Sequence, residues 1–243
     1  MDATSFLDKL IATGATTRQS HSASAALLRR DPENRLLARG PRKRLTPYAI
    51  RDAALFTSDL LNGKIGGPSV KPYMPPGIWR SISNASYKQD KGDKLYRRGM
   101  YTYWRRTVPP PTMMAFNAAA REICTVRTDL TTTPLQALTL LNDPLFFEAS
   151  RALAQRAVRE IDGGTDKRID HVFRICTARL PGDLERRELA DSHRRLVAVL
   201  RRDPGAVAQL VPEKIEGLAP VEVGAWTGVC SVVLNLHEFI TRD

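Results

Sequence analysis

Arginine and aromatic side chains are interleaved between Leu95 and Arg106, in the run LYRRGMYTYWRR. A guanidinium group can bind phosphate, sulfate or carboxylate with two parallel hydrogen bonds, and an exposed aromatic ring can stack on a base or a sugar face. Together these residue types indicate a surface that binds an anionic polymer. The predicted ligand-binding residues are Arg97, Arg98, Tyr101, Tyr103, Arg105, Arg106 and, further along the chain, Arg127.

The same segment is rich in β-forming residues, so we expect it to be a short strand. Because side chains alternate across a strand, Arg97 and Arg105 would share one face with the two tyrosines. With Trp104 and Met100 buried on the other face, this first arginine pair would reach solvent and bind the anion. The other two arginines would then mainly stabilise the fold. The alternative is that all the aromatic rings are core residues and the arginines pair with carboxylates.

The other reactive side chains do not form a recognisable catalytic or metal-binding pattern. Cys124 has arginines on both sides that would favour a thiolate, but with no assignable base it is better explained as a structural residue. The sequence contains no P-loop, nucleophile elbow or paired-histidine zinc helix. We therefore expect no catalytic residue and no metal site. The histidines, none at a metal-ligand spacing, are His21, His171, His193 and His237.

The positive charge of the chain is concentrated in its first half. The formal net charge is +11, from 37 Lys and Arg against 26 Asp and Glu. Residues 1–133 hold 22 basic and 10 acidic residues, whereas residues 134–243 hold 15 and 16. Such asymmetry favours an anionic partner, such as a polysaccharide, an acidic protein domain or a nucleic acid. The alternative is a solvated surface, or one that pairs with an acidic domain.

The second half has the pattern of a helical bundle. Thr133, Pro134 and Gln136 predict a capped helix start, after which Leu135, Leu138 and either Leu141 or Leu140 recur at helical spacing. Asp143 predicts the next cap, and further helices are expected from Asp166, over about 183–202 and around Trp226. We therefore predict a mainly α fold with a helical bundle in the C-terminal half.

The first half is expected to be irregular and loop-rich. Thr46 and Pro47 predict a helix that ends near Asn62. A long loop rich in proline and glycine should then lead to the short strand over Leu95–Arg106. The domain organisation predicted is a basic, loop-rich part at 1–133 and a helical part at 134–243. The two parts are expected to form one structural domain, with a fragment of a longer multidomain protein as the alternative.

Several protein classes are excluded by simple features. No apolar run approaches the roughly 18 residues that a membrane span needs, so no membrane span is expected. Residues 1–17 lack the features of a signal peptide, so the chain expressed as given should be cytoplasmic. Its three cysteines lie more than 50 residues apart, which excludes a Cys-x-x-Cys-His haem-attachment motif.

Eight blocks of the sequence, in order, resemble one known family. They include TTRQS, RDPENRLLARGPRKRL, IRDAAL, IGGPSVKPYMPPGIW, LYRRGMYTYWRRTVPPPTM, REICTVR, TTPLQALTLLNDPLF and VVLNLHEFITRD. The chain resembles, from about Lys9 to Asp243, the C-terminal PSD-type domain of unknown function in planctomycete cytochrome C domain-containing proteins. The resemblance implies a periplasmic or extracytoplasmic setting. It also implies that haem sits only on a separate cytochrome domain, so we expect no cofactor in this chain.

The chain departs from the family pattern at Thr17, Gly99, Asn117, Ala119 and Ala120. The last three stand where Asp, Pro and Asp are common, so any site that used those carboxylates would be altered. The resemblance supplies no catalytic residues.

The function expected is a non-catalytic scaffold or ligand-binding domain of an extracytoplasmic cytochrome c-associated protein. Its partner would be an acidic or cytochrome c-type domain, or an anionic polysaccharide. One alternative is a subunit of an enzyme that acts on a polysaccharide, which could be sulfated. The second alternative, a nucleic-acid-binding module, rests on charge alone and is disfavoured.

Overall fold

The computed structural model describes residues 25–33, 35, 43–82, 86–126, 128, 130–212 and 218–242. The features discussed above at Thr17, His21 and Arg127 fall outside the described residues. The chain divides into two compact units, a small unit of residues 1–45 with 241–243 and a main unit of residues 46–240. The main unit spans the predicted division at residue 133.

The described residues of the small unit form one helix and one short antiparallel pairing. Helix α3 spans Ala25–Arg30, and strand β1 (Lys43–Arg44) pairs with strand β2 (Thr241–Arg242). Lys43 lies opposite Arg242, and Arg44 lies opposite Thr241. Two residues near the end of the chain are thereby joined to residues near position 43.

The helices of the second half begin where capping chemistry predicts. Thr133 accepts a hydrogen bond from the backbone of Gln136, whose side chain accepts one from the Thr133 N–H, which is a complete capping box. Asp143 caps the next helix through the Leu145 N–H, at 2.9 Å. The helices are α7 (Pro134–Asn142), α8 (Pro144–Glu160), α9 (Thr165–Thr177), α10 (Asp183–Leu200), α11 (Pro204–Leu210), α12 (Pro220–Leu234) and the 3₁₀ helix η3 (His237–Ile240).

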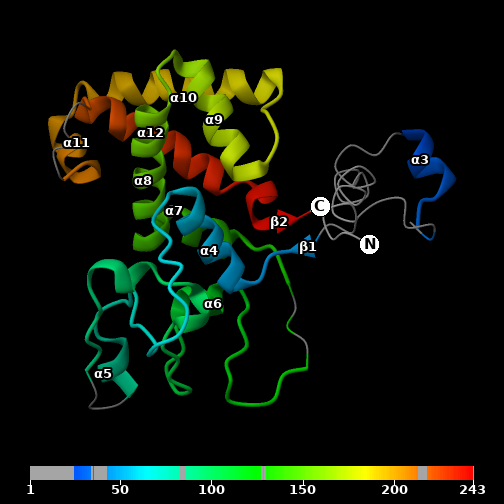
Figure 1. Ribbon diagram of the computed structural model, residues 1–243, viewed down its shortest axis with the longest axis vertical. Helices are drawn as coiled ribbons and strands as arrows, with labels where there is room; N and C mark the ends of the chain where they lie inside the picture. The colour runs from blue at the N-terminus through cyan, green and yellow to red at the C-terminus, as the bar shows by residue number, and fades with distance from the viewer. Residues whose placement is uncertain are drawn as a thin grey trace, which may run out of the picture. The chain divides into compact units, whose positions relative to one another are not determined.

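Helix α12 is the centre of this bundle and packs mainly against α8 and α10 (Figure 1). Its Trp226, Val229 and Cys230 are fully buried. The contact with α10 is close because α12 carries glycines there: a Cβ at Gly228 would lie 2.6 Å from a methyl carbon of Leu196. The predicted mainly α fold with a helical C-terminal half is confirmed.

Two details of the bundle differ from the expectation. Leu135 and Leu138 were expected on one helical face with Leu141 or Leu140, yet Leu138 is 55% exposed, and Leu135 and Leu141 are exposed as well. It is Leu140, on the opposite side of α7, that is buried at 1% exposure. Helix α7 is apolar on more than one face, so its sequence period does not show which face the neighbouring elements cover. Helix α11 was not predicted.

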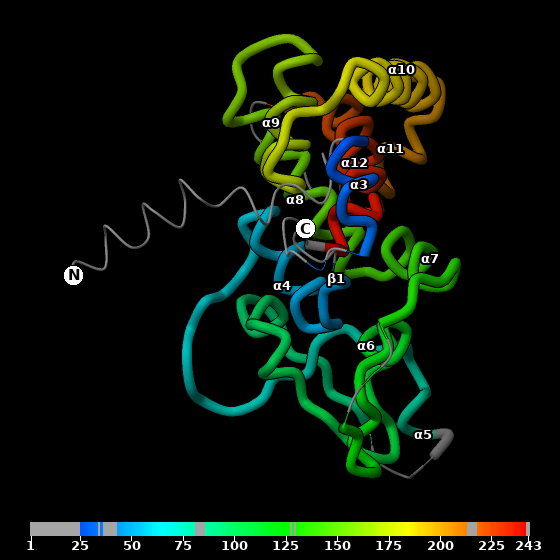
Figure 2. Tube along the Cα trace, turned by 90° about the vertical axis from the view of Figure 1, so that its right-hand side faces the viewer, coloured from blue at the N-terminus to red at the C-terminus, as the bar shows by residue number. Residues whose placement is uncertain are grey.

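The first half of the main unit has short helices joined by long irregular segments. They are α4 (Pro47–Thr57), α5 (Ile78–Ile82), the 3₁₀ helices η1 (Gly92–Tyr96) and η2 (Gly99–Tyr101), and α6 (Pro111–Ala115). Within the main unit, α5 and α6 lie at the end away from α10 (Figure 2). Helix α4 starts at Pro47, as predicted, but ends at Thr57 rather than near Asn62.

The prediction of a strand over Leu95–Arg106 is wrong. The segment forms η1 and η2, and its β-type pairing consists of isolated bridges from Arg97 to Asn62, from Thr102 to Val70 and from Arg105 to Val108. The tight turns break the alternation of side chains on which the two predicted faces depended. Among the described residues, no helix is both long and apolar enough to cross a lipid bilayer.

Candidate ligand-binding surface

Arg97 is a buried structural residue and does not reach solvent as predicted. It is 5% exposed, and its guanidinium donates to the carbonyl oxygens of Lys64 at 3.0 Å, Gly66 at 2.6 Å and Pro68 at 2.9 Å. It also stacks on the Tyr101 ring, with 3.7 Å between the guanidinium carbon and the ring centroid. These bonds hold the loop of residues 64–68 in place.

Tyr101 completes this clamp. Its hydroxyl oxygen accepts a hydrogen bond from the Gly66 N–H at 2.7 Å. Gly66 and Gly67 have φ of 79° and 85°, a backbone conformation that glycine adopts without strain. Arg97, Tyr101 and the loop therefore act as one structural unit, and neither side chain forms part of the surface described below.

Arg98 and Arg106 are both exposed, opposite to their predicted structural role. The Arg98 side chain is 47% exposed and lies 3.8 Å from Asp52. Asp52 in turn accepts a hydrogen bond from the Gly99 N–H at 2.6 Å, while its partial burial raises the pKa of its carboxyl. The backbone packs closely here, since a Cβ at Gly99 would lie 3.1 Å from the Tyr48 backbone. Met100, expected to be buried, is 61% exposed.

Tyr103 and Arg105 join an aromatic cluster that is formed with residues from an earlier segment. This cluster consists of Trp79, Tyr87 and Tyr103, with centroids 5.1 Å apart for Trp79–Tyr87 and 5.9 Å for Trp79–Tyr103. Trp79 is 7% exposed and Tyr103 is 36% exposed, so the cluster is buried at its centre and open at one edge.

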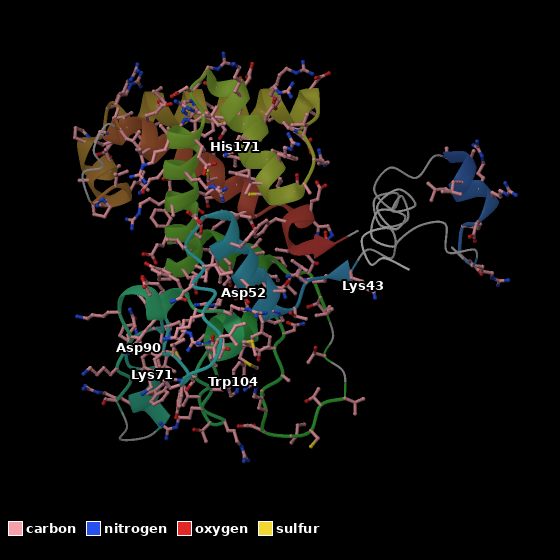
Figure 3. The ribbon with its side chains drawn as sticks, viewed as in Figure 1. Lys43, Asp52, Lys71, Asp90, Trp104 and His171 are labelled. Atoms are coloured by element: carbon pink, nitrogen blue, oxygen red, sulfur yellow. The ribbon has the colours of Figure 1, made fainter. Side chains whose placement is uncertain are left out.

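Two cations lie against the aromatic cluster. The Lys71 ammonium is 5.1 Å from the Tyr103 centroid and 5.8 Å from that of Trp79, and the Arg105 guanidinium is 4.9 Å from Trp79. The backbone of Lys71 is fixed because its N–H donates to Asp90 at 2.7 Å (Figure 3). Lys71 and Arg105 are both half-buried, so part of each residue remains accessible to solvent beside the rings.

A groove of about 370 Å³ borders the aromatic cluster. Trp79 and Tyr87 line it together with exposed Arg80 and the Pro75–Pro76–Gly77 turn. Tyr87 is fixed by donating to the Pro72 carbonyl oxygen at 2.5 Å, and burial raises the pKa of its hydroxyl. The groove combines aromatic walls with nearby cations, the chemistry that suits a sugar carrying sulfate or carboxylate groups.

Trp104 lies outside the aromatic cluster and contacts Ala120 and Arg121 instead. Its indole N–H donates to the Ala120 carbonyl oxygen at 3.0 Å, and the Arg121 guanidinium lies 4.6 Å from its ring. Arg121 also donates to the Tyr48 hydroxyl at 2.9 Å. Of the predicted ligand residues that the structure describes, Tyr103 belongs to the aromatic cluster and Arg105 packs against it, whereas the others lie elsewhere.

A polar network that sequence reasoning missed joins the loops to α8. The Tyr73 and Tyr96 hydroxyls donate to the two carboxylate oxygens of Glu148, at 2.8 and 2.7 Å. Burial, and then the bond to Glu148, raise the pKa of Tyr73 to about 12. Nothing in the sequence could have indicated this network, because the partners are separated by 75 and 52 residues.

A second missed feature is the buried arginine of α4. Arg51 is 4% exposed and donates to the carbonyl oxygens of Arg97 at 2.5 Å and Leu95 at 2.6 Å. Its burial lowers the pKa of the guanidinium to about 10. Arg51 thus fixes the backbone from which the Arg97 clamp projects.

None of the histidines and cysteines that the structure describes lines the groove beside the aromatic cluster. His193 is buried against Trp226, and its burial lowers the pKa of the imidazole. Cys176 and Cys230 are buried, and burial raises the pKa of both thiols, whereas Cys124 is exposed. Within the described part of the chain, no group of three or more His, Cys, Asp or Glu side chains could hold a metal ion.

Comparison with known proteins identifies the family. Residues 4–193 match the family model PSD1, described as a protein of unknown function (DUF1553). The blocks from TTRQS to TTPLQALTLLNDPLF lie within this match, and the block VVLNLHEFITRD lies beyond it. No curated protein and no solved structure gives a significant match to the chain. The chain therefore belongs to the PSD1 family of proteins of unknown function.

Proposed function

We propose that this chain is a non-catalytic ligand-binding domain and that its ligand is an anionic polysaccharide. The observation that carries the proposal is the position of Lys71 and Arg105 against the aromatic cluster, next to the groove of about 370 Å³. A pyranose ring can stack on an aromatic side chain while its sulfate or carboxylate groups pair with the cations.

The charge around the groove supports an anionic ligand. Residues 64–106, here called the basic segment, contain ten basic and two acidic residues. Arg97 is taken up by the loop clamp, but Lys64, Arg80, Lys88, Arg98 and Arg106 are exposed. A field of one sign over this segment would attract a polyanion and raise its rate of association.

The wider setting of the domain is part of the proposal. The resemblance noted above favours an extracytoplasmic protein in which this domain accompanies a separate cytochrome c-type domain. The same cations could then face an acidic surface of that domain. A catalytic polysaccharide-acting subunit is the alternative, and it would differ by releasing shortened products from the bound chain.

The test is a binding titration with a heparin-type polysaccharide at low salt. We expect Lys71→Gln with Arg105→Gln to weaken binding at least tenfold and to make its salt dependence shallower, because fewer counterions are released. Lys167→Gln with Arg174→Gln, two exposed cations of α9, is the matched control and should leave the affinity within twofold. Equal affinities for both double variants would contradict the proposal. Tighter binding of duplex DNA than of heparin at the same salt would favour a nucleic-acid partner instead.

A further inference from the structure

A small cavity lies where the irregular first half of the main unit meets α8. It measures about 30 Å³, and Arg51, Thr102 and Asp143 contribute its polar lining together with Tyr73 and Thr112. Pro72, Pro110, Met113 and Leu145 complete its walls. The cavity therefore lies among α4, α6, the start of α8 and the segment that follows η2, and it is partly open to solvent.

One buried hydroxyl at this cavity is without a hydrogen-bond partner. Thr102 is 6% exposed, and its Oγ1 makes no hydrogen bond within the protein. A buried hydroxyl left in this state costs about 1–3 kcal/mol, so such groups in folded proteins are usually bonded to protein or to ordered water. The hydroxyl therefore indicates a partner that is not part of the chain.

We propose that a single ordered water molecule occupies this cavity and bonds to Thr102 Oγ1. A cavity needs about 10–15 Å³ of this kind of volume to hold one water, and the water needs two to four polar partners. A volume of about 30 Å³ meets the first condition. The polar lining meets the second.

The lining offers both a donor and an acceptor besides Thr102. A guanidinium has five N–H donors, and the carbonyls of Arg97 and Leu95 take up two of those of Arg51. Asp143 accepts from the Leu145 N–H through Oδ1 and from the Thr112 hydroxyl through Oδ2, and each carboxylate oxygen has a second lone pair. The water accepts from Arg51 and donates to Asp143, and it satisfies the Thr102 hydroxyl.

The water links three segments that are distant in sequence. Arg51 belongs to α4, Asp143 separates α7 from α8, and Thr102 immediately precedes Tyr103 of the aromatic cluster. The backbone on both sides of Thr102 is already paired with Val70, whose N–H donates to the Tyr101 oxygen and whose oxygen accepts from the Tyr103 N–H. The water is thus a structural ligand that helps to position Tyr103, and its presence does not depend on the proposed polysaccharide.

A high-resolution crystal structure of the protein and of Thr102→Val tests this proposal. We expect one ordered water within hydrogen-bond distance of Thr102 Oγ1 in the unmodified protein, and its loss in the valine variant. Thr139→Val is the matched control because the Thr139 hydroxyl bonds only within its own helix, to the Leu135 oxygen at 2.8 Å. This control should retain the water.

Oxygen-17 relaxation dispersion of water measures the same site in solution. The unmodified protein should show one more long-lived water than Thr102→Val. An empty cavity in the unmodified protein, or a water that persists unchanged in the valine variant, would overturn the proposal. If Thr102→Val does not fold, the electron density of the unmodified protein decides alone.

Discussion

Replacing Arg97 by alanine tests whether this residue holds the loop of residues 64–68. The substitution removes three hydrogen bonds to carbonyl oxygens and the stacking on Tyr101. The loop residues are exposed, so water can bond to the released carbonyls, and each lost bond should cost about 0.5–1.5 kcal/mol. The lost stacking adds about 0.5–2 kcal/mol. We therefore expect the free energy of unfolding to fall by about 3 kcal/mol.

The assay is chemical and thermal unfolding, combined with amide hydrogen exchange. For a domain of this size, 1 kcal/mol corresponds to about 2–4 °C in Tm, so the expected decrease is about 6–12 °C. The Gly66 N–H, which donates to Tyr101, should exchange faster. Arg98→Ala is the control: the Arg98 side chain is exposed and lies 3.8 Å from Asp52, so its loss should cost less than about 1 kcal/mol. If both variants lose the same small amount and Gly66 exchange is unchanged, the assignment of Arg97 as a clamp is refuted.

Three further outcomes are expected. Thr133→Ala should cost about 1 kcal/mol in urea unfolding through loss of the N-cap, and a neutral result would contradict the capping box. Leu140→Ala should cost about 2–5 kcal/mol because Leu140 is 1% exposed, whereas Leu138→Ala at 55% exposure should cost under about 1 kcal/mol; the reverse order would mean that the other face of α7 is buried. Folding raises the pKa of Tyr73 from 10.0 to about 12, so its contribution is complete below pH 10 and is lost as pH rises towards 12. Stability measured across that range should fall less steeply in Tyr73→Phe, and an unchanged slope would exclude this origin.

The features that sequence predicted well are those determined by neighbouring residues. The starts of α7 and α8 depend on the capping residues Thr133 and Asp143, and each cap bonds to a residue no more than three positions away. Capping can be predicted from the sequence because the donor and the acceptor lie within one turn of the helix and no distant segment takes part. The burial of Ile169, Val172, Phe173 and Cys176 on one face of α9 follows from helical period in the same way.

The features that sequence predicted badly depend on distant partners. Arg97 bonds to carbonyls about 30 positions earlier in the chain, and no side-chain pattern records where a carbonyl oxygen will lie. The aromatic cluster brings together Trp79, Tyr87 and Tyr103 from both sides of η1. The segment from Leu95 to Arg106 is rich in residues that favour strands. It nevertheless forms two 3₁₀ helices, because β-propensity is overridden by the tertiary contacts of a segment.

Hydroxyl-radical footprinting with a heparin-type oligosaccharide tests the proposed binding surface most directly, because it reports where on the chain a ligand lies. Side chains that line the groove, above all Tyr87 and Met74, should become protected, together with Tyr103 of the bordering aromatic cluster. Exposed Leu138 on α7 should keep its reactivity and serves as the internal reference. Protection confined to the helical second half, or no protection at an oligosaccharide concentration that saturates binding, would contradict the account.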